Sequence, residues 1–139
     1  MRKQNIAITV DAIVFRGSKE KSEILFIKRK NDPFKGNWAL PGGFVDEGEN
    51  LPDAAARELL EETGVVTNAM VQLGAFGKPG RDPRGHTISI AYIAFVEENT
   101  EALGADDADE AKWFSVKKLP EMAFDHAEIV NLALQKVML

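Results

Sequence analysis

The chain has 139 residues, with 17 Lys and Arg against 22 Asp and Glu, and its net charge of −5 fits one compact, acidic domain. Its 45% apolar residues are too many for a disordered chain, yet no run approaches the roughly 20 apolar residues of a membrane helix. Without cysteine it forms neither disulfides nor thiolate metal sites, and its acidity argues against nonspecific nucleic-acid binding as its main task.

Apolar stretches separated by turn residues predict strands in the first third of the chain. The stretch 6–15 is β-branched and apolar on both faces, as in a strand covered on both sides, and Asp11 is one of its two polar residues. We expect Asp11 to make a local hydrogen bond or an interface contact. Further strands are predicted over 24–29 and around 38–40, where the Pro-Gly-Gly at 41–43 ends the strand. No apolar signal core precedes the first strand, which predicts a cytoplasmic protein.

Two helices are predicted, one over 51–63 and one over 126–137. Asn50 is the N-cap of the first and Gly64 its C-terminal stop, whereas the second begins at His126, which we expect to be structural. The remaining strands are expected within 65–76, over 87–96 and around 112–116. This order predicts an α+β fold in a single domain.

The charge is unevenly distributed along the chain. Residues 46–62 carry seven acids and one base, a net −6, and residues 97–110 carry seven acids and no base, a net −7. The remainder therefore sums to +8. Two solvated surface stretches would explain this pattern, and so would a cation site that faces an anionic ligand.

The predicted helix 51–63 places acids at the border of its packing face. Glu58 and Glu62 are i, i+4 neighbours, Glu58 and Glu61 are i, i+3, and each pair of like charges costs an exposed helix a few tenths of a kcal/mol. Arg57 offsets part of this repulsion but cannot neutralise three glutamates. A salt-bridged surface helix is one interpretation. The other is a site for Mg²⁺ or Mn²⁺, because carboxylate oxygens without nearby His or Cys suit these hard cations.

The stretch from Gly43 to Val65 decides between these interpretations. It reads Gly, five residues, Glu49, seven residues, Arg57-Glu58, an aliphatic residue, any residue, Glu61-Glu62, any residue, Gly64 and an aliphatic residue. These nine specified positions in 23 residues match the Nudix box without a mismatch. The chain therefore resembles the Nudix hydrolases over essentially its whole length, as one Nudix domain over 1–139.

The resemblance implies a mixed β-sheet sandwiched between α-helices and a Mg²⁺-dependent (or Mn²⁺-dependent) hydrolase of nucleoside diphosphate derivatives. Glu58 and Glu62 would be the principal metal ligands, Glu61 a further or water-mediated ligand, and the carbonyl of Gly43 would complete the shell. Arg57 would orient the glutamates and Glu49 would support it. Metal ions on a diphosphate neutralise developing charge and activate water for attack on phosphorus.

A turn-rich loop over 74–86 is the candidate substrate-binding segment. Arg81, Arg84 and His86 lie in it, and arginine offers a planar fork suited to phosphate, although a solvated hairpin loop is the alternative. Arg29, at the end of a strand, is a further candidate phosphate contact, with a surface ion pair as the alternative. This loop resembles that of the ADP-ribose pyrophosphatase branch, but the proline often found about sixteen residues past the box is replaced here by Arg81.

The second acidic stretch is expected to supply one more carboxylate. Nudix hydrolases commonly place a metal-binding or base carboxylate in a loop at this point. Asp107 is the first candidate for this catalytic role, followed by Glu110 and Asp106, and a solvated loop is the alternative for each. Adenine-stacking candidates are Phe15, Phe34 and Trp38, although aromatic residues in such strands more often belong to the core.

The resemblance implies hydrolysis of ADP-ribose to AMP and ribose 5-phosphate. It also implies a homodimer, because ADP-ribose hydrolases of this group often complete the site with a neighbour's loop. Enzymatic alternatives are pyrophosphohydrolases of other nucleoside diphosphate derivatives or of ordinary or oxidised nucleoside triphosphates. The non-enzymatic alternative is an ADP-ribose-sensing module. We expect an enzyme, because the box keeps every catalytic position and 139 residues leave no room for a DNA-binding domain.

Overall fold

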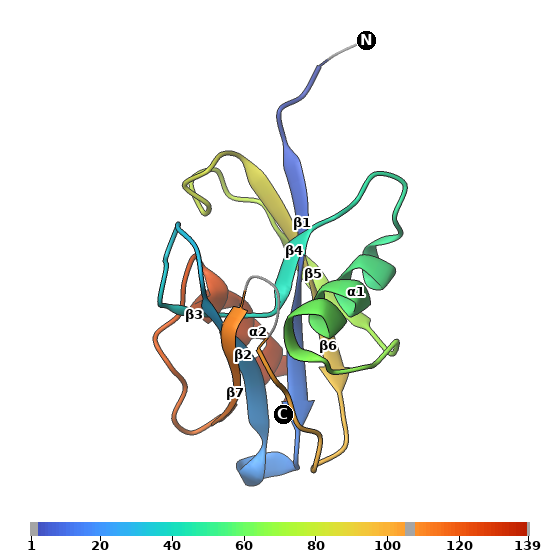
Figure 1. The fold of residues 1–139 in the computed structure, drawn as a ribbon, viewed down its shortest axis with the longest axis vertical. Helices are drawn as coiled ribbons and strands as arrows, with labels where there is room; N and C mark the ends of the chain where they lie inside the picture. Colours follow the sequence, from blue (N-terminus) through green and yellow to red (C-terminus); the bar gives the residue numbers. More distant parts are fainter. Residues whose placement is uncertain (1–2, 105–107, 139) are drawn as a thin grey trace.

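The computed structural model describes residues 3–104 and 108–138, which form a mixed β-sheet with two α-helices (Figure 1). The strands are β1 (Ala7–Arg16), β2 (Glu23–Arg29), β3 (Trp38–Ala39), β4 (Gly42–Phe44), β5 (Val71–Phe76), β6 (Thr87–Phe95) and β7 (Ala108–Ser115). The helices are α1 (Leu51–Thr63) and α2 (His126–Val137), with a short 3₁₀ turn at Lys19–Lys21. Within the described residues, neither helix is long and apolar enough to cross a membrane.

β1 is the central strand of the sheet. It pairs in parallel with β6 along nine residues, from Ala7 opposite Thr87 to Phe15 opposite Phe95. The path through the sheet runs β3-β2-β1-β6-β5, and its other pairings are antiparallel, as are those of β7 with β2 and of β4 with β1. β1 therefore pairs with three other strands, β2, β4 and β6.

The two faces of β1 are both covered, which confirms the strand predicted from its apolar run. Ile13 and Phe15 pack with α2, in a cluster that includes Ile129 and Val130 of that helix. The alternate residues Val10, Ala12 and Val14 face the other side, where their clusters include Ala54, Ala55 and Leu59 of α1. Because strand side chains alternate between faces, the sheet lies between the two helices.

The predicted bounds of both helices are confirmed, and β3 ends before Pro41, as predicted. The chain bends at Pro41, and Gly42–Phe44 then form β4 against Thr9–Asp11 of β1, a strand that was not predicted. Two short strands thus follow each other, β3 on β2 and β4 on β1. The strand predicted around 112–116 also begins earlier, at Ala108. The bend at Pro41 brings the Gly-Gly pair close to Glu58 and Glu62 of α1.

Candidate functional site

The Gly-Gly pair of β4 lies against the two principal glutamates of α1. The backbone N–H of Gly42 donates a hydrogen bond of 2.8 Å to Glu62 Oε1, and Glu62 is 5% exposed. A Cβ placed on Gly43 would lie 2.6–2.7 Å from the carboxyl atoms of Glu58. Glycine is therefore required at 43 for the backbone to approach this carboxylate so closely.

Arg57 distributes its guanidinium over the other acids of this region. Its Nε and Nη2 donate to both oxygens of Glu49, at 2.7 and 2.9 Å, and Nη1 donates to Glu58 at 2.9 Å and to Glu61 at 3.2 Å. Nη2 also donates to the carbonyl of Phe44 in β4, at 3.2 Å. Arg57 thus ties the loop before α1, the helix and β4 together.

The electrostatics of this cluster follow from those bonds. Hydrogen bonds from Arg57 are the largest cause of the lowering of the pKa of Glu49 to about 2, and bonds to Glu49 and Glu58 raise the pKa of Arg57. One guanidinium is shared among Glu49, Glu58 and Glu61, with Asp46 a further 3.6 Å contact, so negative charge remains in excess.

The donor set fits a hard divalent cation. Two largely buried carboxylates, Glu58 and Glu62, meet a glycine backbone that leaves room for them, and all the donors are oxygens. Across the described part of the chain, no three acidic or histidine side chains gather closely enough to form a ready-made metal cluster. The glutamates of α1 repel one another because their charges are alike. The side chain of Glu61 is held by Arg57.

A cleft of about 310 Å³ opens beside these glutamates. Glu58, Glu62, Gly43 and Asp46 line one side of it. Its other lining residues come mainly from β1, β2, the loop between β5 and β6, and the start of α2, and include Asp11, Arg29, Arg81, Asp82, Arg84, Phe124 and His126. Carboxylates and arginines thus share one cleft, as metal-assisted binding of a diphosphate requires.

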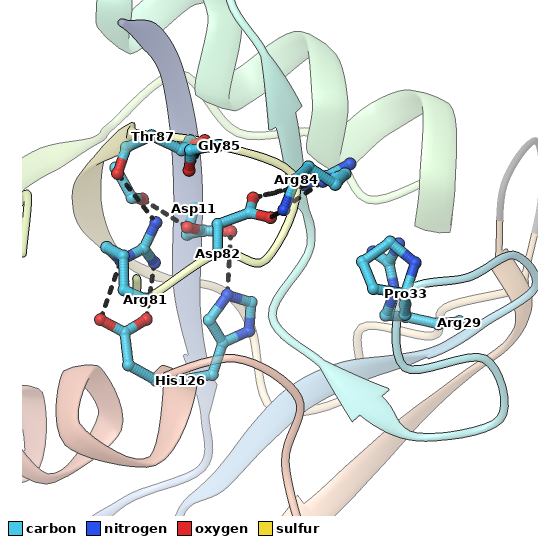
Figure 2. A network of polar contacts seen from close by, with 11 residues as sticks. Asp11, Arg29, Pro33, Arg81, Asp82, Arg84, Gly85, Thr87 and His126 are labelled. Carbon is cyan, nitrogen blue, oxygen red and sulfur yellow. Dashed lines mark hydrogen bonds and ion pairs between the residues drawn. The ribbon is translucent and has the colours of Figure 1, made fainter. Parts of the chain in front are cut away.

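Arg81 lines the cleft but is already engaged by an acid. Its Nε and Nη2 donate to the two oxygens of Asp125 at 2.8 and 2.6 Å, and its side chain is 5% exposed. Burial acts to lower the pKa of Arg81, but the bonds and charge of Asp125 outweigh this and raise it. The predicted phosphate ligand therefore anchors the β5–β6 loop to the N-terminus of α2 (Figure 2).

Arg84 is the more accessible of the two loop arginines. Its side chain is 40% exposed and forms a two-pronged ion pair with Asp82 inside the same loop. Its guanidinium also lies 5.0 Å from the ring of Phe44 and 5.5 Å from that of Phe124. Burial acts to raise the pKa of Asp82, but the hydrogen bonds and charge of Arg84 outweigh it, so the pKa is lowered overall. Arg84 therefore presents cationic charge to the cleft from a fixed aromatic and acidic support.

The other two predicted substrate contacts differ in their position. Arg29 lines the cleft, donates to the carbonyl of Pro33 at 2.6 Å and lies 5.0 Å from the ring of Phe124. His86 is not among the residues that line this cleft, and its Nε2 lies 3.1 Å from the carbonyl of Gly77. The structure brings Arg29, Arg81 and Arg84 to one cleft and leaves His86 outside it.

Of the three candidates from the second acidic stretch, only Glu110 lies within the described residues. Asp106 and Asp107 lie outside the described residues. Glu110 is exposed on β7, and its carboxylate lies 3.9 Å from Lys28 Nζ. It is not among the residues that line the cleft.

Of the three aromatic candidates for adenine stacking, two belong to or pack against the core and one is exposed near the cleft. Phe15 is 1% exposed in the core, and Trp38 packs against the α2 side of the core. Phe34 is 38% exposed, and its ring centroid lies 4.7 Å from that of Phe124, a cleft residue that the sequence analysis did not single out. Asp11 and His126 also line the cleft, although only a hydrogen-bonding or structural role was expected of them.

Comparison with known proteins gives a consistent set of relatives. The model of the NUDIX domain matches residues 6–133. ADP-ribose pyrophosphatase of Methanocaldococcus jannaschii is 48% identical over 90% of this chain and 71% of its own. The ADPR-responsive transcriptional repressor NtrR of Acinetobacter baylyi is 33% identical over 94% of this chain, which spans only about half (54%) of the repressor. The NUDIX domain of Shewanella oneidensis NrtR, solved with ADP-ribose, superimposes with a TM-score of 0.89 at 31% identity, covering 96% of this chain and 90% of that one.

Proposed function

The chain belongs to the Nudix family, and on that premise we propose that it hydrolyses the diphosphate linkage of ADP-ribose, giving AMP and ribose 5-phosphate. The observation that carries the proposal is the 48% identity with an archaeal ADP-ribose pyrophosphatase over 90% of the chain. The shared cleft of glutamates and arginines supports it, because such a cleft suits a diphosphate bound through a cation.

Mg²⁺ is the proposed cofactor, with Mn²⁺ as its substitute, in keeping with the general use of divalent metals by Nudix hydrolases. Glu58, Glu62 and the carbonyl of Gly43 would hold the ion, with Glu61 as a direct or water-mediated ligand. A bound divalent ion supplies neutralisation of the diphosphate and a more acidic water molecule. Arg57 would keep the glutamates in place, and Glu49 would hold Arg57 through its paired hydrogen bonds.

The arginines of the cleft would orient the substrate. Arg84 and Arg29 lie in the lining and would contact phosphate or ribose oxygens, whereas Arg81 would hold the loop through Asp125. The proton acceptor or additional ligand from the second acidic stretch remains proposed as Asp107, with Glu110 and Asp106 as alternatives. A comparison of the turnover of ADP-ribose by the Asp107→Asn, Glu110→Gln and Asp106→Asn variants tests this assignment.

ADP-ribose sensing without hydrolysis is the second candidate function. The observation that favours it is the likeness to the NrtR NUDIX domain solved with ADP-ribose. The enzyme is preferred, because this chain keeps all four glutamates of the box and holds two of them, Glu58 and Glu62, beside the Gly-Gly backbone. A sensor has no need to retain those glutamates.

A cytoplasmic location, expected from the sequence, and a homodimer complete the proposal, and the homodimer rests on the family resemblance. Multi-angle light scattering of the purified chain tests the dimer, since one protomer weighs 15.3 kDa.

A panel of substrates tests the proposed activity. Rates with Mg²⁺ would be measured for ADP-ribose, diadenosine polyphosphates, NADH, nucleotide sugars and nucleoside triphosphates, with the products identified. We expect the highest kcat/KM for ADP-ribose. Preferred release of pyrophosphate from a nucleoside triphosphate would assign the chain to the nucleotide-pool enzymes instead. Tight binding of ADP-ribose without turnover of any compound would support the sensor.

A further inference from the structure

A buried polar cluster joins the start of α2 to the segment that leads into β4. His126 Nδ1 accepts a hydrogen bond of 3.0 Å from the backbone N–H of Leu40. His126 Nε2 lies 3.6 Å from Asp11 Oδ1, and the Ser89 hydroxyl donates to the other oxygen of Asp11 (Figure 2). His126, Asp11 and Ser89 are 4%, 7% and 0% exposed. Buried polar groups that are this well connected fix one local geometry.

The hydrogen bond at Nδ1 sets the tautomer of His126. Because Nδ1 accepts from Leu40, the proton of the neutral ring is on Nε2, the nitrogen that faces Asp11. Burial lowers the pKa of His126, with partial opposition from the charge of Asp11. Asp11 therefore faces an N–H group and favours the ring orientation in which Nδ1 can accept.

The segment 40–43 is held by successive contacts. Leu40 donates to His126, the carbonyl of Pro41 accepts from the N–H of Ala12 at 2.9 Å, and Gly42 donates to Glu62 at 2.8 Å. Asp11 also lies close to Gly42, where an added Cβ would be 2.5 Å from its Oδ1. The backbone of 40–43 thus contacts Asp11 and His126 as well as the glutamates of α1.

We propose that Asp11 and His126 are positioning residues, which set the backbone of 40–43 and thereby the geometry of the divalent-cation site at Gly43, Glu58 and Glu62. The inference rests on the proposed function, which assigns the cation to those three residues. Residues that orient metal ligands without touching the ion typically change metal affinity about 10- to 100-fold when they are replaced. Asp11 and His126 are placed to act in this way through Leu40 and Gly42.

Two substitutions at His126 separate its two contacts. Asparagine places its side-chain oxygen near the position of Nδ1 and keeps an acceptor for Leu40, whereas glutamine reaches toward the position of Nε2 and leaves the Leu40 N–H without its partner. Asp11→Leu removes the group that faces Nε2 and keeps a side chain that branches at Cγ. Val130→Ala is the stability control, because Val130 is a fully buried residue of the same helix that belongs to the apolar core.

The measurement is the affinity of the substrate-free protein for Mn²⁺, followed by the electron paramagnetic resonance signal of the free ion. We expect His126→Gln to weaken binding at least tenfold and His126→Asn about threefold. Asp11→Leu should weaken it at least threefold, and the Asp11→Leu/His126→Gln double variant should be no weaker than His126→Gln, because the pair acts as a unit. Val130→Ala should lower the melting temperature and keep wild-type affinity.

Equal effects of His126→Gln and His126→Asn, or wild-type affinity in both, would overturn the proposal. So would losses of affinity that follow the melting temperature, with Val130→Ala affected alike. If His126→Gln does not fold, Asp11→Leu carries the test, and wild-type Mn²⁺ affinity in that variant overturns the inference. Glu62→Gln is measured in parallel: if it binds Mn²⁺ as the wild type does, the proposed metal site fails, whatever the His126 variants show.

Discussion

Glu62 on α1 accepts a hydrogen bond from the backbone of Gly42 on β4, at 2.8 Å. The two residues are 20 positions apart in the chain, so the bond joins a helix to a strand that folding brings beside it. It also holds the buried carboxylate of Glu62 in the lining of the cleft. A buried carboxylate is costly unless it is hydrogen-bonded or paired with a cation. The bond to Gly42 contributes to that need, and the proposed divalent ion would contribute further.

Glu62→Gln should lower turnover of ADP-ribose by roughly 10²- to 10³-fold, the loss expected when one group that stabilises developing charge is removed. The fold should persist, because the glutamine amide oxygen still accepts from Gly42. Steady-state kinetics and circular dichroism check both points. Asp53→Asn, which removes an exposed acid of the same helix, is the matched control. Near wild-type turnover in Glu62→Gln would end the metal assignment.

Gly43→Ala should impair metal binding more than stability. The added methyl would lie 2.6–2.7 Å from the carboxyl atoms of Glu58 and would push that side chain away from its position. We expect Mn²⁺ affinity to fall about tenfold or more. Gly74→Ala is the control, because an added Cβ there has no neighbour within 4 Å. Equal Mn²⁺ affinity in the two variants would contradict the role given to the Gly43 backbone.

Arg81→Ala and Arg84→Ala should differ in kind. Removing Arg81 leaves the largely buried Asp125 without its ion pair, and breaking such a pair costs about 3–5 kcal/mol of the free energy of unfolding. Arg84 is more exposed, so Arg84→Ala should chiefly raise the KM for ADP-ribose. Its cost in stability should be smaller than that of Arg81→Ala, because the buried Asp82 keeps the hydrogen bond from the backbone N–H of residue 84 and the nearby charge of Arg81. Urea unfolding and Michaelis–Menten kinetics separate the two. A large loss of stability in Arg84→Ala, or a wild-type unfolding free energy in Arg81→Ala, would contradict these assignments.

The stability of the protein should fall as the pH decreases below about 6.5, because burial lowers the pKa of His126 in the folded state. The unfolded chain then binds a proton that the folded chain does not, so protonation favours unfolding. This contribution is fully present above pH 6.5 and is lost as the pH falls toward the folded pKa. Urea unfolding between pH 7.5 and 5.0 measures it. His126→Asn should flatten the curve, and an unchanged slope would show that another group titrates.

Local signals in the sequence predict the helices and the placement of Glu62 on α1 well. Asn50 and Gly64 bound α1 as expected, and the packing face of α1 includes the predicted acid Glu62, because capping and helical spacing are local properties. β4 could not be predicted in this way. Its stability comes from pairing with β1, more than 30 residues away in the chain, which no short pattern around Gly42 and Gly43 contains.

The arginines show the same limit. A basic, turn-rich loop suggested phosphate contacts for Arg81 and Arg84 alike, but the partner of Arg81 is Asp125, 44 residues later. Asp11 gave a signal, since it is an acid within an otherwise apolar strand, yet its proximity to His126 depends on how α2 meets the sheet. The sequence pattern thus indicated that Arg81, Arg84 and Asp11 were unusual for their positions. Which residues they contact depends on the tertiary fold.

The most direct test of the central claim is the balance of products from ADP-ribose with and without Mg²⁺. The proposed reaction predicts AMP and ribose 5-phosphate in equal amounts when Mg²⁺ is present, no products after chelation with EDTA, and restored products when Mg²⁺ is returned. Equal rates of product formation in EDTA would contradict the role of the glutamate site. Intact ADP-ribose after prolonged incubation with Mg²⁺ would contradict the proposed activity itself.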